Sequence, residues 1–138
     1  MTAQTVKQDA FFIASDILGE FVSRIDAGSA VSVAELCSPD VILRAMGLEG
    51  DISFLTMQME QRDAAGYQSR HTVNSTRISS ASDDEIRGTA TIVSFRKGET
   101  GMASIAVADW VFLLRKLEDQ WLFGEIGLDL FAALETDK

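Results

Sequence analysis

The stretch RHTVNS, residues 70–75, marks the point at which the hydrophobic pattern of this chain changes. Before it, apolar residues recur every three or four positions, which is typical of helices. After it, they alternate with polar residues, which is typical of β-strands. The same stretch carries the only histidine of the chain. Because imidazole is the side chain that most readily gains or loses a proton near neutral pH, His71 is the first candidate for a functional residue.

Three helices are predicted before this stretch. The first runs from Thr5 to Asp26, where apolar residues at three- and four-residue spacing give one buried face. Gly28 ends it, because glycine tolerates the left-handed backbone conformation. A short second helix begins with a capping box at residues 32–35 and is closed by Pro39. Asp51 is a suitable N-cap for the third helix.

Strands are predicted between the second and third helices and again from residue 70 onward. Val41–Met46 is a short β-branched segment, followed by a loop that Gly47 and Gly50 bracket. Four longer runs are separated by turn-forming residues: Arg70–Ser79, Ile86–Phe95, Ser104–Arg115 and Gln120–Phe131. Helices followed by hairpin-linked strands indicate an α+β fold, in which three N-terminal helices pack on a strongly curved, mainly antiparallel sheet. We expect residues 1–138 to form a single domain.

Such a sheet is expected to enclose a conical pocket, because the helices cannot fill the whole concave face of a strongly twisted sheet. The run Ser104–Arg115 is apolar on both faces. One face carries Ala106, Ala108, Trp110, Phe112 and Leu114, and the other carries Ile105, Val107, Asp109, Val111 and Leu113. A strand that is apolar on both faces is usually covered on both. Since helices cover only one face, we predict a homodimer made sheet to sheet.

The composition of the chain limits its possible binding partners and indicates its cellular compartment. The formal net charge of -9, without a basic stripe, argues against nucleic acid and against an anionic membrane surface. Cys37 is the only cysteine, so a reducing cytoplasm is expected. Asp9 and Asp16 interrupt the N-terminal apolar residues, which disfavours secretion and a membrane span. One histidine without clustered ligands predicts no metal, and no cofactor is expected.

Three short sequence segments follow one another along nearly the whole chain. Residues 21–28 end the first helix with an aspartate, residues 70–75 open a strand with Arg-His, and residues 107–123 form a last hairpin with a tryptophan on its returning strand. In this order they resemble the NTF2-like superfamily. The resemblance is narrower to its SnoaL-like group, which includes scytalone dehydratase, bile-acid dehydratase, polyketide cyclases and ring-hydroxylating dioxygenase β subunits. It implies an NTF2-like cone.

The resemblance also implies a pocket in which Asp26 and His71 approach one another. In catalytic relatives such a carboxylate holds the imidazole in one tautomer, while the other ring nitrogen moves a proton on the substrate. Phe21 stands where those relatives carry a tyrosine, and Trp110 replaces another tyrosine. Glu125-Ile126 stands where many of them carry an arginine. These replacements imply a more apolar pocket.

Two functions of different classes follow from these residues. The first is a cofactor-independent lyase or isomerase acting on a small, largely apolar cyclic molecule, with His71 as general base and Asp26 as its orienter. The second is a non-catalytic ligand-binding or assembly module. A third alternative is a partner subunit like a dioxygenase β chain, which would copurify with a larger iron protein. Asp109 is either a paired buried acid or a hydrogen-bonding group of an interface. The residues expected to contact a small-molecule ligand are Phe21, Phe54, Met57, Ser75, Asp109 and Trp110.

Overall fold

The computed structural model describes residues 3–98, 101 and 103–134 of the 138-residue chain. The elements in chain order are α1 (Ala3–Asp26), the 3-10 helix η1 (Ala30–Leu36), β1 (Cys37–Ala45), β2 (Leu48–Gly50), α2 (Ile52–Ala65), β3 (Ser69–Ala81), β4 (Glu85–Lys97), β5 (Ala103–Leu117) and β6 (Gln120–Leu134). Three helices precede the long strands, as the sequence predicts, and the α+β fold class is confirmed.

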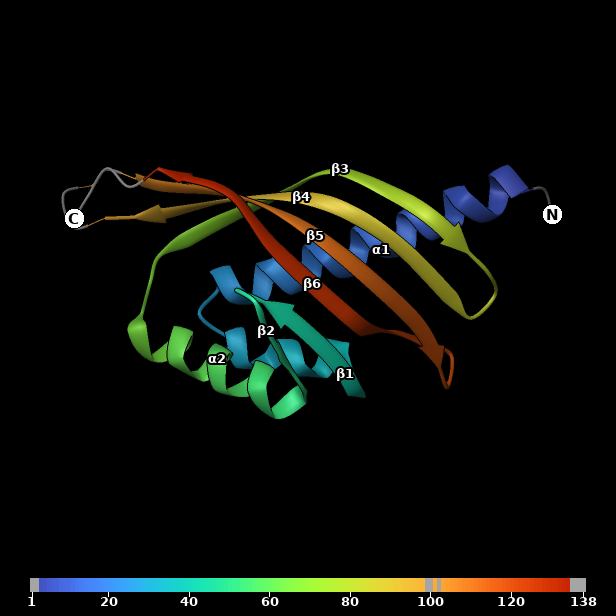
Figure 1. Cartoon of the computed structure of the whole chain (residues 1–138), viewed down its shortest axis with the longest axis horizontal. Helices are drawn as coiled ribbons and strands as arrows, with labels where there is room; N and C mark the ends of the chain where they lie inside the picture. The colour runs from blue at the N-terminus through green and yellow to red at the C-terminus, as the bar shows by residue number, and fades with distance from the viewer. Residues whose placement is uncertain (1–2, 99–100, 102, 135–138) are drawn as a thin grey trace.

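The strands form one sheet in the order β2-β1-β6-β5-β4-β3. All neighbours are antiparallel except β1 and β6, which run parallel, so the sheet is mixed. In Figure 1 the long strands β3 to β6 twist and arch over α1, while α2 lies on the same side near β1. The sheet therefore curves around the helices, and no helix among the described residues covers its convex face.

The buried face of α1 packs into the concave side of the sheet. Ala14, Leu18 and Phe21 are at most 3% exposed, and they contact the inward-facing residues of β5 and β6 in one core. The stripe starts at Ala10, which is buried, whereas Phe11 is exposed. This stripe fixes the C-terminal end of α1 against the opening of β3.

The predicted capping box of the second helix is wrong. The helix is a 3-10 helix that begins at Ala30, and the Ser32 hydroxyl donates to the carbonyl of Ser29 instead of capping. The free backbone N–H groups of Ala30 and Val31 donate to the carboxylate of Asp63, at 2.7 and 3.0 Å. The cap therefore comes from α2, more than thirty residues further along the chain. Pro39 closes no helix, since it lies within β1.

The loop predicted between Gly47 and Gly50 contains β2. Met46 and Gly47 both have positive φ, 53° and 75°, and they turn the chain so that β2 pairs back on β1. Positive φ at two successive residues gives the tight hairpin turn that matches strand twist. Asp51 caps α2 as predicted, because its side chain accepts from the Phe54 backbone N–H at 3.1 Å.

Candidate functional site

The last residue of α1 and the third residue of β3 meet at the concave side of the sheet. His71 Nδ1 lies 2.6 Å from Asp26 Oδ1, and the His71 backbone N–H donates to Asp26 Oδ2 at 2.8 Å. The two side chains are only 11% and 13% exposed. The structure therefore brings together the two residues that the sequence named as base and orienter.

Two residues that sequence reasoning missed support this pair. The Ser69 hydroxyl donates to Asp26 Oδ1 at 2.8 Å, and Arg62 Nη2 donates to the Ser69 oxygen at 2.8 Å. Ser69 lies two positions before His71 on one strand, so the period of two places both on one face. The alternation could have indicated Ser69. Arg62 lies on α2, and only the tertiary fold brings it close.

The ionised carboxylate of Asp26 determines which ring nitrogen of a neutral His71 carries the proton. Burial opposes ionisation of Asp26, but hydrogen bonds from the His71 ring, the Ser69 hydroxyl and the His71 amide outweigh it, so its pKa lies below the usual value. An ionised carboxylate only accepts, so a neutral imidazole carries its proton on Nδ1. Among the described residues, no hydrogen-bond partner is found for Nε2.

His71 lines a cavity of about 430 Å³ between the helices and the sheet. The other residues in its wall come from α1 and α2 on one side and from the sheet and its β1–β2 turn on the other: Phe21, Ile25, Leu43, Ala45, Met46, Leu55, Gln58, Met59, Arg62, Ala108, Trp110, Ile126, Leu128, Asp129 and Leu130. Phe21 packs edge to face on Trp110, with ring centroids 5.5 Å apart. Apolar side chains predominate in this wall, and its polar residues besides His71 are Gln58 and Arg62 of α2 and Asp129 of β6.

Four of the predicted ligand contacts do not line this cavity. α2 presents Leu55, Gln58, Met59 and Arg62 to it, which is one helical stripe, so Phe54 and Met57 fall off that stripe. Phe54 borders a different hollow, and Met57 is 47% exposed.

The other two lie on the strands. Ser75 is exposed and has φ of 52° at an irregularity in the pairing of β3 and β4. Asp109 alternates with Ala108 and Trp110, so it lies on the convex face, where it is exposed opposite Asp129.

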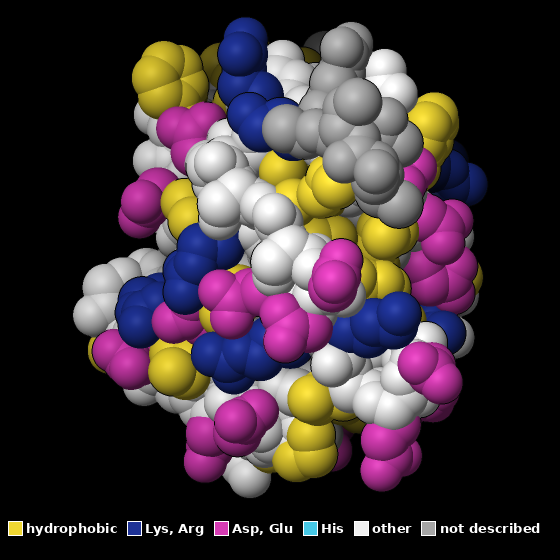
Figure 2. Space-filling view, turned by 90° about the vertical axis from the view of Figure 1, so that its right-hand side faces the viewer, with side chains coloured by type: hydrophobic (Ala, Val, Ile, Leu, Met, Phe, Trp, Pro, Cys, Tyr) yellow, Lys and Arg dark blue, Asp and Glu magenta, His cyan; other side chains and the backbone are white. Residues whose placement is uncertain are grey.

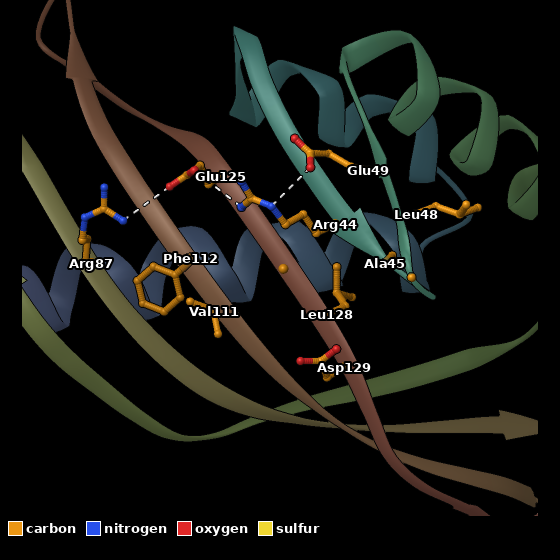
Figure 3. Close-up of a pocket in the computed structure, with 12 residues that line it drawn as sticks. Arg44, Ala45, Leu48, Glu49, Arg87, Val111, Phe112, Glu125, Leu128 and Asp129 are labelled. Atoms are coloured by element: carbon orange, nitrogen blue, oxygen red, sulfur yellow. Dashed lines mark hydrogen bonds and ion pairs between the residues drawn. The ribbon is translucent and has the colours of Figure 1, made fainter.

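A second hollow of about 580 Å³ lies on the convex face, where β1, β2 and β4 to β6 meet (Figure 3). Its charged side chains pair with one another. Glu125 lies between Arg87 and Arg44, at 3.4 and 3.5 Å, and Arg44 also contacts Glu49 at 3.7 Å. Arg44, Arg87, Glu49 and Glu125 therefore neutralise one another, while Asp129, which also lines this hollow, forms no ion pair with another described residue.

Within residues 3–98, 101 and 103–134, no three His, Cys, Asp or Glu side chains gather closely enough to hold a metal ion. No helix in this part of the chain has the length and apolar character needed to cross a membrane. On the face drawn in Figure 2, Lys and Arg side chains lie beside Asp and Glu side chains, without a continuous basic stripe.

The fold has well-defined structural relatives. A scytalone dehydratase-like protein of Novosphingobium aromaticivorans superposes with a TM-score of 0.83 at 11% identity, covering 98% of this chain and 93% of that one. The hexachlorocyclohexane dehydrochlorinase LinA-type3 of Novosphingobium barchaimii gives 0.77 at 10% identity, covering 96% and 93%. A protein of N. aromaticivorans assigned as the β subunit of an aromatic-ring-hydroxylating dioxygenase gives 0.77 at 15% identity, covering 93% and 92%.

These comparisons define the fold. An NTF2-like protein with a cystatin-like fold also superposes, with a TM-score of 0.78 at 15% identity, covering 94% of this chain and 86% of that one. No protein-family model and no curated protein matches the sequence. The chain has the NTF2-like fold, as the resemblance of the three sequence segments 21–28, 70–75 and 107–123 predicts. Its relatives in fold include lyases and a dioxygenase subunit, so the fold alone does not select a reaction.

Proposed function

We propose that this protein is a cofactor-independent lyase or isomerase that acts on a small, largely apolar cyclic molecule. The observation that carries the proposal is the 2.6 Å contact between His71 Nδ1 and Asp26 Oδ1 at the wall of the 430 Å³ cavity. An oriented imidazole with a free second nitrogen is the arrangement that general base catalysis requires. Two enzymes of the same fold, the dehydratase-like protein and the dehydrochlorinase, support this reaction class.

In the proposed reaction, Nε2 of His71 removes a proton from a ring carbon of the substrate. The electron pair of that C–H bond then forms a new C=C bond. In a lyase the leaving group departs from the adjacent carbon with its own bonding pair, and the imidazolium returns the proton to the departing group or to water. In an isomerase an adjacent π bond of the substrate opens as the new C=C bond forms, and the imidazolium then returns the proton to the carbon at the far end of that π system. Asp26 stays ionised throughout and stabilises the imidazolium that forms, which is the role of the carboxylate in other oriented-base pairs.

Turnover of variants on a substrate panel tests the proposal. Cyclic ketones and hydroxyketones are incubated with the protein in D₂O, and NMR follows deuterium uptake and loss of water. Positioned general bases contribute roughly 10² to 10⁴ in rate, so His71→Gln should lower turnover by about that factor. Asn74→Ala is the matched control, because Asn74 lies on the same strand and is exposed. Equal activity in the two variants would contradict the base role.

The second candidate is a non-catalytic ligand-binding or assembly module. It is favoured by Phe21, which places a phenyl ring in the cavity wall where a hydroxyl would be needed to polarise a substrate, and by the β subunit of the same fold. The variant Phe21→Tyr distinguishes the two candidates. If the wild type is inactive and this variant gains dehydratase or isomerase activity, the chain is a binding module that has lost its chemistry.

We also propose that the protein resides in the reducing cytoplasm, which its single cysteine favours. We further propose that two copies form a dimer through the convex face of the sheet. Val93 of β4 and Val107 of β5 are register partners on this face and are partly exposed, and Val111 is 56% exposed. Leu113 is the exception to the predicted apolar face, because it is already buried at 1%. A second copy would cover the remaining residues, since a two-fold interface uses the same patch on both subunits.

A further inference from the structure

Arg62 is the one cationic side chain in the wall of the cavity. It follows Leu55 and Met59 on the inward stripe of α2, so its guanidinium lies among apolar residues on the same side as His71. Among the described residues it donates one hydrogen bond, from Nη2 to the Ser69 hydroxyl oxygen. A guanidinium has five N–H donors, and the others remain available to a ligand.

In the described part of the chain the Arg62 guanidinium forms no direct ion pair, although Ser69 links it by hydrogen bonds to the ionised Asp26. Among the described residues, no carboxylate oxygen lies within 4.0 Å of the Arg62 guanidinium. Asp63, its chain neighbour, is occupied by the two amides of η1. Asp26 is occupied by His71 and Ser69. A partly buried cation without a paired anion is costly, and a bound anion would compensate it.

A second cation lies close by. The guanidinium carbon of Arg96 is 4.2 Å from the centroid of the Tyr67 ring, and that of Arg62 is 5.7 Å from it. Burial and the charge of Arg96 lower the pKa of Arg62, while Asp26, Tyr67 and Asp63 act in the opposite direction. The two arginines add positive charge at the α2 side of the cavity, whose wall also carries the carboxylate of Asp129.

We propose that Arg62, together with Gln58, binds a carboxylate group on the small cyclic ligand of this cavity. The ligand class is then an apolar ring that carries one carboxylate, with the ring against Phe21 and Trp110 and the carboxylate at α2. A guanidinium matches a carboxylate in charge and in its planar, forked geometry. The inference deepens the ligand-binding part of the proposed function, and it needs no assumption about the reaction.

Sequence reasoning indicated the opposite. Glu125-Ile126 stands where many relatives carry an arginine that would bind an anion, so the resemblance implies a more apolar pocket without an anion-binding group, and Ile126 is fully buried in the cavity wall. The structure supplies a guanidinium from α2 instead of from β6. A purely structural role, in which Arg62 only holds Ser69, is the competing explanation.

Matched ligand pairs test the proposal by isothermal titration calorimetry. The probes are 1-naphthoate against 1-naphthamide and cyclohexanecarboxylate against cyclohexanecarboxamide, which differ in charge and little in shape. In the wild type the carboxylate should bind about 10- to 100-fold more tightly than the amide, the range of one or two charge-assisted hydrogen bonds. In Arg62→Gln the ratio should fall to near one.

Two control variants separate the explanations. Ser69→Ala removes the hydrogen bond to Ser69 but keeps the guanidinium, so the carboxylate preference should persist. Arg77→Gln removes an exposed arginine of β3 and should also leave the preference unchanged. Melting temperatures of all variants check that they fold.

Three results would overturn the proposal. The wild type could show no carboxylate preference, which includes the case in which no probe binds. Alternatively, the preference could stay unchanged in Arg62→Gln, or it could be lost in Ser69→Ala. The same titrations in His71→Ala separate this inference from the proposed reaction, because binding is measured where turnover is absent. A carboxylate preference with no activity would retain the inference and reject the enzyme. Turnover by the wild type without a carboxylate preference would retain the enzyme and reject this inference.

Discussion

Asp26 accepts three hydrogen bonds at two oxygens, from the ring and amide of His71 and from the hydroxyl of Ser69. A carboxylate at the C-terminal end of a helix is mildly unfavourable because of the helix dipole. Here the three donors and the neighbouring imidazole compensate for that position. The same hydrogen bonds that orient His71 therefore also fix the junction between α1 and β3.

Protonation of Asp26 should destabilise the fold. Its pKa is below 3.8 in the folded protein and returns to about that value on unfolding, so the unfolded chain binds the proton first as the pH falls. The stabilisation is present above the unfolded pKa and is lost as the pH falls through the folded value. We expect the free energy of unfolding of Asp26→Asn to fall less steeply between about pH 5 and pH 3 than that of the wild type.

Urea unfolding at several pH values measures this slope. Asp16→Asn corrects for the loss of one negative charge, since Asp16 is an exposed residue of the same helix. Equal slopes for Asp26→Asn and Asp16→Asn would show that the hydrogen bonds to Asp26 do not stabilise its ionised form.

Cys37 should be unreactive in the folded protein. The thiol is buried, donates to the Val33 carbonyl at 3.5 Å, and burial raises its pKa to about 12. The thiolate is the reactive form, so labelling by a disulfide reagent at pH 8 should proceed only when the chain opens. Labelling should speed up with added urea in parallel with unfolding. Rapid labelling of the native protein would contradict the buried position.

At the scale of elements, η1 depends on a residue of α2. Asp63 accepts from the backbone of Ala30 and Val31, so two otherwise free N–H groups at the start of η1 are satisfied. Asp63→Ala should lower the free energy of unfolding by about 1–3 kcal/mol, the cost of leaving such donors unsatisfied. Chemical denaturation measures it, with Glu60→Ala on the exposed side of α2 as control. A change within 0.5 kcal/mol, roughly that of an ordinary surface substitution, would contradict this role.

The same residue shows what local sequence can and cannot predict. The period of α1, the Asp51 cap and the change of period near residue 70 depend on neighbours in the chain, and these features were predicted correctly. The start of η1 was wrong because its cap lies on another element. Ser69 was missed as a partner of Asp26 for the same reason, since their hydrogen bond joins residues 43 positions apart.

The candidate site divides in a similar way. Phe21, Trp110 and His71 line the cavity, whereas Asp109 falls on the convex face because strand residues alternate. The alternation was visible in the sequence, so this position could have been excluded. Arg62 follows Leu55 and Met59 at helical spacing, so the sequence could have placed it on the same stripe, but its contact with Ser69 of β3 depends on the tertiary fold.

At the scale of the whole molecule, the convex face of the sheet is where we expect the second copy. Val107→Lys places a charge at the centre of that face, where desolvating it in a dimer would be costly. Light scattering at micromolar concentration should give a dimer for the wild type and a monomer for this variant. Val31→Lys, on exposed η1, is the control and should stay dimeric. A monomeric wild type would remove the proposed interface.

The imidazole of His71 links the helices, the sheet and the cavity, and its tautomer can be measured without knowing the substrate. Two-dimensional ¹⁵N NMR of the ring distinguishes a protonated nitrogen from a bare one. Near pH 7.5 we expect a single tautomer with the proton on Nδ1 and a bare Nε2, and the Nε2 signal should shift when a ring compound such as 1-naphthamide or 1-naphthoate fills the cavity. Rapid exchange between tautomers, or an Nε2 signal insensitive to every such compound, would contradict an oriented base at the cavity wall.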